Sequence, residues 1–391
     1  MKEWKTYKIA DIVDEISMGP FGSNIKVENF ISEGIPVLNG SNLQGYRLNE
    51  ESFNYVSEEK ANSLGKANAY RGDVVITHRG TLGQIIYIPS DSKYERYVIS
   101  QSQFRLKLKR NIVRPDFLVY YFHTAIGQHK ILMNASQVGV PALARPTSTF
   151  REVTLPIPPM DIQNKIMDIL LSIDGKLAVN KQINDNLEQQ ASSLLSDWIS
   201  TYPCRTYKLS DICKYVSAKC DTGNLTSQNY ISTENMLPNK KGIVDASNIP
   251  SGKVTCFKVD DILIANIRPY FQKIWKADIS GGCSTDVLCI RSCVESHSPI
   301  LYWILHQDAF FEYVMTGAKG CKMPRGDKQH IMNWTIDLPG PEYWADIATQ
   351  LGAVDQRLAY NRVESINLSN LRDTLLPKLI SGELEINELD C

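Results

Sequence analysis

The sequence has no long apolar run and no excess of charge of either sign. No stretch approaches the roughly 18 apolar residues that a membrane-spanning helix needs. The opening residues, MKEWKTYKIADI, carry charges where a signal peptide would have its apolar segment. Lysine and arginine number 42 against 43 aspartates and glutamates among 391 residues. A uniformly basic protein is therefore excluded, and any surface for a polyanion must be local.

The nine cysteines have the spacing of neither a disulfide framework nor a zinc site. Their number is odd, and eight of them fall between Cys204 and Cys321. Cys289 and Cys293 come nearest to a zinc-binding pair, but no second pair of suitable spacing follows them. We therefore expect free thiols in a reducing cytoplasm, and no bound metal.

Motifs for catalysis and nucleotide binding are also missing. The sequence contains no GxxxxGK[ST] phosphate loop, no GxGxxG turn, no HExxH zinc motif and no GxSxG nucleophile elbow. A DNA amino-methyltransferase would carry Asn/Asp-Pro-Pro-aromatic, whereas the only Pro-Pro here is Pro158-Pro159, between Ile157 and Met160. We therefore predict a chain with no catalytic residues and no cofactor of its own.

What the sequence does contain is an internal repeat of about 190 residues. The stretch KTYKIADI at 5–12 returns as RTYKLSDI at 205–212. Pro141 matches Pro324 at an offset of 183, as does the apolar stretch 117–122 with 300–305. Later, DGKLAVNK from Asp174 matches DQRLAYNR from Asp355 at an offset of 181. The chain therefore carries one module twice, which predicts an approximate two-fold symmetry.

Each copy has two parts of different character. The first parts, 1–155 and 201–338, mix β-rich runs with short helices and are punctuated by Gly, Asn and Pro, which is typical of a mixed domain. The second parts, 156–200 and 339–385, are each expected to form one long helix, and 386–391 is left as a tail. The predicted fold class is α+β, with two mixed domains joined by two long antiparallel coiled-coil helices.

Apolar residues recur at spacings of three and four along both long helices, which predicts a seam between them. Leu371 is one of the expected seam residues in the second helix. Asn180 and Asn361 fall at equivalent positions in the middle of the two seams. A buried Asn at such a position fixes helix register; the alternative is that both side chains face solvent.

Positive charge is concentrated in parts of the mixed domains. Residues 66–110 contain nine basic and three acidic residues. Residues 130–151 contain three basic and no acidic residues, and the equivalent 314–330 contains four basic residues and one acidic residue. The C-terminal 341–391 is acidic, with nine acidic and four basic residues. A DNA-binding surface is therefore expected on the mixed domains rather than on the second long helix.

Two loops with Gly and Pro, 136–141 and 319–324, occupy equivalent positions within these basic segments. Gln, Arg and Lys are side chains that recognise base edges in the major groove. Polar residues that follow the predicted buried strands near 77 and 265 provide further candidates, although ordinary solvated turns are the alternative for each loop. The candidate DNA-binding residues are His78, Arg79, Gln137, Arg145, Arg268, Lys319, Lys322 and Arg325.

Several motifs occur in a characteristic order. They are the opening W-K-x-Y-K-I-x-D-I, GPFGS at 19–23, PVLNGSN at 36–42, GDVVITHRG at 72–80, LPIPP at 155–159 before Gln163, and LRDTLL at 371–376. In these motifs and their duplication the chain resembles the specificity subunits of type I restriction–modification systems over essentially its whole length. It departs from the pattern where the second copy has Pro339-Gly-Pro341 and Trp344, so that helix start is expected to pack differently.

The resemblance implies a subunit without catalytic activity. Each mixed domain would be a target recognition domain that recognises one half of a bipartite, asymmetric double-stranded DNA site. The helices would set the spacer and bind two modification subunits, which would bring S-adenosylmethionine and methylate an adenine in each half-site. Restriction subunits that use ATP and magnesium would join this core.

Two other classes of protein stay open from the residues alone. A coiled-coil scaffold whose globular ends bind proteins would share the repeat but would need no basic loops. An enzyme with an unrecognised site would methylate or cleave DNA as the purified chain. DNA-binding and activity assays distinguish these alternatives from a specificity subunit.

Overall fold

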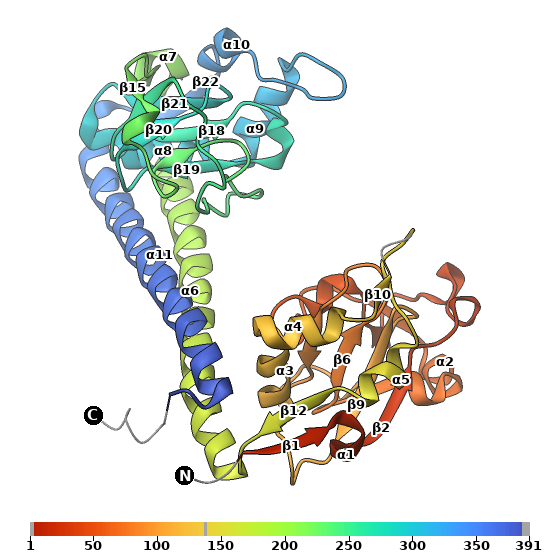
Figure 1. Cartoon of the computed structure of the whole chain (residues 1–391). Coiled ribbons are helices and arrows are strands. Elements are labelled where there is room, and N and C mark those ends of the chain that lie inside the picture. Colours follow the sequence, from red (N-terminus) through yellow and green to blue (C-terminus); the bar gives the residue numbers. More distant parts are fainter. Residues whose placement is uncertain (1–3, 137–138, 385–391) are drawn as a thin grey trace. The chain divides into compact units, whose positions relative to one another are not determined.

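The computed structural model describes residues 4–136 and 139–384 (Figure 1). The chain forms two compact units: the first takes the chain up to Leu177 and again from Asn367, and the second spans Ala178–Ile366. Each unit contains one mixed domain and a part of each long helix. The predicted tail, 386–391, lies outside the described residues.

The mixed domain of the first unit is built on two four-stranded sheets. One antiparallel sheet consists, in spatial order, of β2 (Val13–Met18), β9 (Gln103–Leu108), β6 (Val74–Thr77) and β7 (Ile85–Tyr87). The other consists of β4 (Asn54–Val56), β3 (Ile35–Val37), β8 (Arg96–Val98) and β5 (Asn68–Tyr70), with β3 and β8 parallel. All four residues of β6 are buried, as expected for an inner strand whose two faces are both covered.

Short helices and two two-stranded sheets complete this domain. Helix α3 (Pro115–His123) begins with Pro at its first position, where a missing N–H costs nothing, and residues 116–122 are all buried. β1 (Lys5–Lys8) pairs antiparallel with β12 (Thr154–Ile157), so the domain's first and last strands lie side by side (Figure 1). The remaining elements are α1 (Ile9–Ile12), α2 (Glu58–Ser63), α4 (Ala125–Leu132), β10 (Ala135–Ser136), β11 (Ala142–Leu143) and α5 (Pro146–Arg151).

The mixed domain of the second unit repeats this plan. Its first sheet consists of β14 (Cys213–Tyr215), β21 (Val287–Ser292), β18 (Ile262–Ala265) and β19 (Ile274–Lys276), and its second of β15 (Lys219–Asp221), β17 (Lys253–Phe257), β20 (Gly281–Cys283) and β16 (Tyr230–Ile231). β13 (Cys204–Lys208) pairs with β22 (Thr335–Pro339) as β1 pairs with β12. The helices are α7 (Leu209–Ile212), α8 (Ser298–Leu305), α9 (Asp308–Thr316) and α10 (Lys328–Met332).

The duplication predicted from the sequence is confirmed by strand order, and one difference marks divergence. The order β2-β9-β6-β7 equals β14-β21-β18-β19. In the second sheets, the parallel pair β3–β8 corresponds to β16–β20, and the antiparallel pair β5–β8 to β17–β20. The fourth strand, however, pairs with β3 in the first unit and with β17 in the second. The two domains therefore share a framework and differ at its edge.

The two long helices are α6 (Met160–Thr201) and α11 (Trp344–Ser381), with 42 and 38 residues. In the first unit, Arg372 of α11 contacts Asp174 of α6 at 3.0 Å. In the second unit, Asn361 donates a hydrogen bond to Asn184 at 2.7 Å. In the same unit, Asn180 donates to Glu364 at 2.7 Å. Residue numbers along α6 therefore rise as those of their partners on α11 fall, so the helices pair antiparallel in the second unit. None of the described helices has the length and hydropathy of a membrane span.

The two helices begin in different ways. Gln163, fully buried, donates hydrogen bonds to the carbonyls of Ile112 and Pro158 at 2.8 and 2.9 Å and accepts one from the Arg114 N–H at 2.9 Å. At the start of α11 the indole N–H of Trp344 donates to the Pro339 carbonyl at 2.7 Å. Both contacts anchor a helix start to the domain that precedes it.

The prediction that Leu371 lies in the helix seam was wrong. Leu371 is 47% exposed, whereas Leu376, Leu379 and Ile380 of the same helix are buried in the first unit's core. At 100° per residue, Leu371 lies about 140° around the helix from Leu376, outside the buried stripe. The spacing of leucines alone did not indicate where the stripe changes face.

Candidate nucleic-acid interface

In the first unit, three segments meet where β6 leaves the sheet. The His78 N–H donates to the Ser102 carbonyl, the Gly80 N–H to the Pro141 carbonyl, and the Leu143 N–H to the His78 carbonyl, each at 2.8 Å. Residues 78–80 are therefore held between the turn at 100–103 and the segment after residue 139. Polar candidates that are distant in sequence are brought to one end of the sheet.

Of the predicted side chains in this unit, two arginines are exposed. Arg79 and Arg145 form no ion pair with any described residue. His78 is half-buried, with Nε2 3.1 Å from the Gln101 carbonyl, and burial lowers its pKa, so the ring is neutral at pH 7. Gln137 lies outside the described residues. The uncompensated charge at this end of the sheet thus comes from Arg79 and Arg145.

The second unit repeats the arrangement where β18 leaves its sheet. The Asn266 N–H donates to the Asp286 carbonyl at 2.8 Å, and the Arg268 N–H donates to the Pro324 carbonyl at 2.7 Å. The second bond is the counterpart of the Gly80–Pro141 bond. The equivalence of Pro141 and Pro324 in the sequence therefore corresponds to the same backbone contact in both units.

The predicted basic residues of this second loop differ in their partners. Lys319 and Arg325 exchange two backbone hydrogen bonds of 2.9 Å across the turn. Lys319 also pairs with Asp327 at 2.6 Å, and Arg325 with Asp286 at 3.1 Å. These ion pairs are largely exposed, so they are weak and can exchange for a phosphate. Lys322 is exposed at the tip and has no ion pair within the described residues.

Arg268 combines backbone strain with an unsatisfied polar atom. Its φ is 51°, and its Nε is buried without a hydrogen-bond partner among the described residues, as is Oδ1 of the neighbouring Asn266. Arg145 in the first unit has φ 48°, and both arginines directly precede a proline. A non-glycine residue in this region costs about 1–2 kcal/mol, and such strain and unpaired groups concentrate at binding sites.

The chain is similar to several known proteins. A family model described as a type I restriction modification DNA specificity domain matches residues 1–189. The type I restriction enzyme MjaIX specificity subunit of Methanocaldococcus jannaschii is 20% identical over 99% of this chain and 95% of its own. The HindI specificity subunit of Haemophilus influenzae is 29% identical over 51% of this chain and 41% of its own. The solved S subunit of the type I system of M. genitalium has the same fold, with a TM-score of 0.59 at 17% identity over 96% of both chains.

Over nearly its whole length, the chain is similar to type I restriction–modification specificity subunits. A specificity subunit is the non-catalytic, DNA-recognising member of its system, which agrees with the motifs the sequence lacks. The scaffold alternative is not favoured, and the assignment of the two mixed domains as target recognition domains stays a prediction.

Exposed aromatic side chains beside the interface were missed from the sequence. Phe21 is 83% exposed, in a turn that begins where the Gly19 N–H donates to the Gln103 carbonyl at 2.8 Å. In the mixed domain of the second unit, Tyr270 and Phe271 are exposed and directly follow Arg268-Pro269. Apolar and aromatic side chains of this kind contact bases or insert between base steps. The Arg-Pro-Tyr-Phe run was the available sequence signal.

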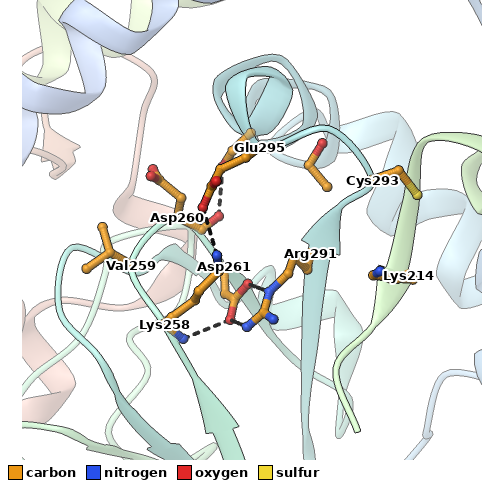
Figure 2. Close-up of a pocket in the computed structure, with 10 residues that line it drawn as sticks. Lys214, Lys258, Val259, Asp260, Asp261, Arg291, Cys293 and Glu295 are labelled. Carbon is orange, nitrogen blue, oxygen red and sulfur yellow. Dashed lines mark hydrogen bonds and ion pairs between the residues drawn. The ribbon is translucent and has the colours of Figure 1, made fainter. Parts of the chain in front are cut away.

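The residues that line the pocket in Figure 2 form ion pairs with one another. Arg291 makes two 2.6 Å hydrogen bonds to the fully buried Asp261, and Lys258 pairs with Glu295 at 2.7 Å. In the mixed domain of the first unit, Asp73, the counterpart of Asp261, pairs with Arg105 at 3.1 Å, although Arg105 aligns with Cys289 and not with Arg291. Both pairs hold the turn before the inner strand, β6 or β18, so their role is structural. Among the described residues no three His, Cys, Asp or Glu side chains are grouped as a metal site would require.

Proposed function

We propose that this specificity subunit recognises a bipartite, asymmetric DNA sequence, with one half-site bound by each recognition domain. The observation that carries the proposal is the repeated arrangement at the ends of β6 and β18. Equivalent positions hold different side chains, since His78 corresponds to Asn266 and Gly80 to Arg268. One framework with different side chains is suited to two half-sites of different sequence.

The contacts divide by chemistry. Exposed Arg79, Arg145 and Lys322 are available to phosphates, which position the protein, or to guanine edges, which specify sequence. Lys319 and Arg325 join them when DNA displaces Asp327 and Asp286. Arg268, with its buried Nε and adjoining aromatic residues, is the candidate for a directed base contact in the second half-site.

The helices α6 and α11 are proposed to set the spacer and to bind two modification subunits. Half-sites recognised from one face of the duplex lie roughly 34 Å apart, and helices of 42 and 38 residues extend about 60 Å. The modification subunits would bind S-adenosylmethionine, and restriction subunits would bind ATP and magnesium. The eight cysteines of the described residues are free thiols, which supports the prediction of a cytoplasmic protein. We retain 1–155 and 201–338 as the proposed recognition domains, with 156–200 and 339–385 as spacer segments.

The test is to map methylated adenines in DNA exposed to the full chain in complex with its modification subunits. We expect two different short sequences separated by a constant number of unspecified base pairs, with one methylated adenine in each. A single uninterrupted motif would contradict the bipartite proposal. Absence of DNA binding by the assembled complex would contradict DNA recognition altogether.

A further inference from the structure

A partly buried carboxylate on α6, whose side chain is 23% exposed, connects the first recognition domain to both long helices. The Tyr120 hydroxyl, on α3, donates a hydrogen bond to Asp174, and Arg372 of α11 lies 3.0 Å from the same carboxylate. Tyr120 is 1% exposed and stacks on Tyr46, with ring centroids 4.1 Å apart, and the Arg372 guanidinium lies 5.1 Å from the centre of the Tyr46 ring. We refer to Asp174, Tyr120, Tyr46 and Arg372 as the Asp174 cluster.

A second carboxylate, on α11, makes the corresponding connection in the second unit. The indole N–H of Trp303, on α8, donates to Asp355 at 2.9 Å, and Lys276 of β19 pairs with Asp355 at 2.8 Å. Lys276 also pairs with Asp260, one of the residues in Figure 2, at 2.8 Å. The Asp355 side chain is 10% exposed. We refer to Asp355, Trp303, Lys276 and Asp260 as the Asp355 cluster.

The two clusters occupy equivalent positions of the repeat. Asp174 corresponds to Asp355 at the offset of 181, and Tyr120 to Trp303 at the offset of 183. Both copies keep an aromatic ring with a polar hydrogen that bonds to the helix carboxylate, although the ring itself has changed. The cation comes from a different element in each copy, from α11 as Arg372 and from β19 as Lys276. Both units thus share a hydrogen bond from an aromatic side chain of the domain to a carboxylate of a long helix.

Burying a charge for this bond is not an efficient way to gain stability. Desolvation offsets much of the attraction within a buried ion pair, and apolar residues of similar volume often stabilise a protein as well or better. Burial raises the pKa of Asp355, and Lys276 opposes this effect. A hydrogen bond differs from apolar contact in being directional, because it weakens steeply as its angle departs from linearity. The carboxylates therefore constrain the angle between domain and helix.

We propose that the Asp174 and Asp355 clusters are positioning sites that fix the orientation of each recognition domain on its long helix, and thereby the spacer length that the subunit accepts. The proposal rests on the bipartite recognition proposed above. Changing the spacer by one base pair moves a half-site by about 3.4 Å along the duplex axis and turns it by about 35°. A domain held by a directed bond resists that rotation, whereas a domain held only by apolar contacts tolerates part of it.

The test measures methylation by the full chain in complex with its modification subunits. The substrates are duplexes that keep both half-sites and carry the natural spacer, one base pair fewer or one base pair more. For Asp174→Leu and Asp355→Leu, which remove the acceptor, we expect the ratio of kcat/KM on the natural spacer to that on the altered spacers to fall about 10-fold, while the preferred half-site sequences stay the same. Asp168→Leu on α6 and Asp346→Leu on α11 are matched controls on exposed carboxylates, and should leave the ratio unchanged.

Tyr120→Phe is the decisive second variant, because it keeps the ring stacked on Tyr46 and removes only the hydroxyl that bonds to Asp174. We expect the same loss of spacer discrimination. An unchanged ratio in Tyr120→Phe, or a change in half-site sequence in place of spacer preference, would overturn the positioning role. If the unmodified complex shows no bipartite site, the proposed function itself fails, so the two failures are distinguishable.

Discussion

Arg145 and Arg268 share a left-handed backbone conformation and a place directly before proline. Glycine adopts this conformation without the penalty that a Cβ imposes. We expect Arg145→Gly and Arg268→Gly to leave the free energy of unfolding equal or higher. Each variant should also lose about 1–3 kcal/mol of discrimination between bases at one position of its half-site. Each variant should affect only its own half-site, so each is the control for the other. Methylation mapping checks the prediction, and unchanged half-sites in both would contradict it.

His306 makes stability depend on pH. Burial lowers its pKa to about 3, and its Nε2 is buried without a hydrogen-bond partner among the described residues. The unfolded state binds a proton below about pH 6.5 and the folded state does not, so this group's contribution is lost as pH falls from about 6.5 towards 3.

Between pH 7 and pH 5 the loss from His306 amounts to about 2 kcal/mol. His306→Gln should remove that part of the pH dependence, as measured by denaturant unfolding at both values. His129→Gln, at an exposed histidine, is the matched control. Equal pH dependence in His306→Gln and the unmodified chain would show that His306 is not responsible.

At the scale of single elements, the helix seam contains two fully buried asparagines. Asn180 donates to Glu364 at 2.7 Å and Asn361 to Asn184 at 2.7 Å, while Oδ1 of both asparagines is buried without a partner among the described residues. A role in register stays a prediction. Asn180→Leu and Asn361→Leu should raise the free energy of unfolding by about 1–2 kcal/mol, since an unsatisfied carbonyl is removed.

The same substitutions should weaken the preference for one register. Cross-linking between cysteines introduced on α6 and α11 measures the register, and Asn370→Leu on the exposed side of α11 is the control. Lower stability combined with an unchanged register would argue against the prediction.

Shortening both helices by facing heptads tests the spacer role. The contacts of Asn180 and Asn361 place residues 180–186 opposite 359–365 in the second unit. Removing both segments shortens the paired helices by about 10 Å, which corresponds to about three base pairs. We expect methylation mapping to find a spacer shorter by about that amount, whereas deletion of 180–186 alone leaves α11 unmatched. An unchanged spacer in an active complex would rule out this role.

Elements with strong local patterns could be predicted from the sequence. The apolar run of β6 and the proline at the start of α3 indicated both elements, and the duplicated motifs indicated that the plan occurs twice. The different attachment of β4 and β15 could not be predicted, because these three-residue strands are partly exposed and their pairing is long-range. The sequence indicated the candidate interface through the Gly- and Pro-containing loops within its basic segments. The strain and buried Nε of Arg268 arise from tertiary contacts and have no local sequence pattern.

At the scale of the whole molecule, the segments proposed to contact the second half-site all lie within 201–338. Replacing these residues with the second recognition domain of another family member should change one half-site and leave the other unchanged. The incoming domain must offer a polar aromatic donor where Trp303 bonds to Asp355, because Asp355 stays on α11. Methylation mapping of the hybrid complex gives the result, and a change in both half-sites would contradict independent recognition.

The pairing of β1 with β12, and of β13 with β22, has a consequence for how new specificities arise. The chain comes into each recognition domain and leaves it through neighbouring strands, so insertions and deletions between those strands need not disturb the helix that follows. Evolution is therefore free to remodel the loops of one domain, or to replace it by recombination at its flanks, while the long helices, which are proposed to bind the modification subunits, are preserved.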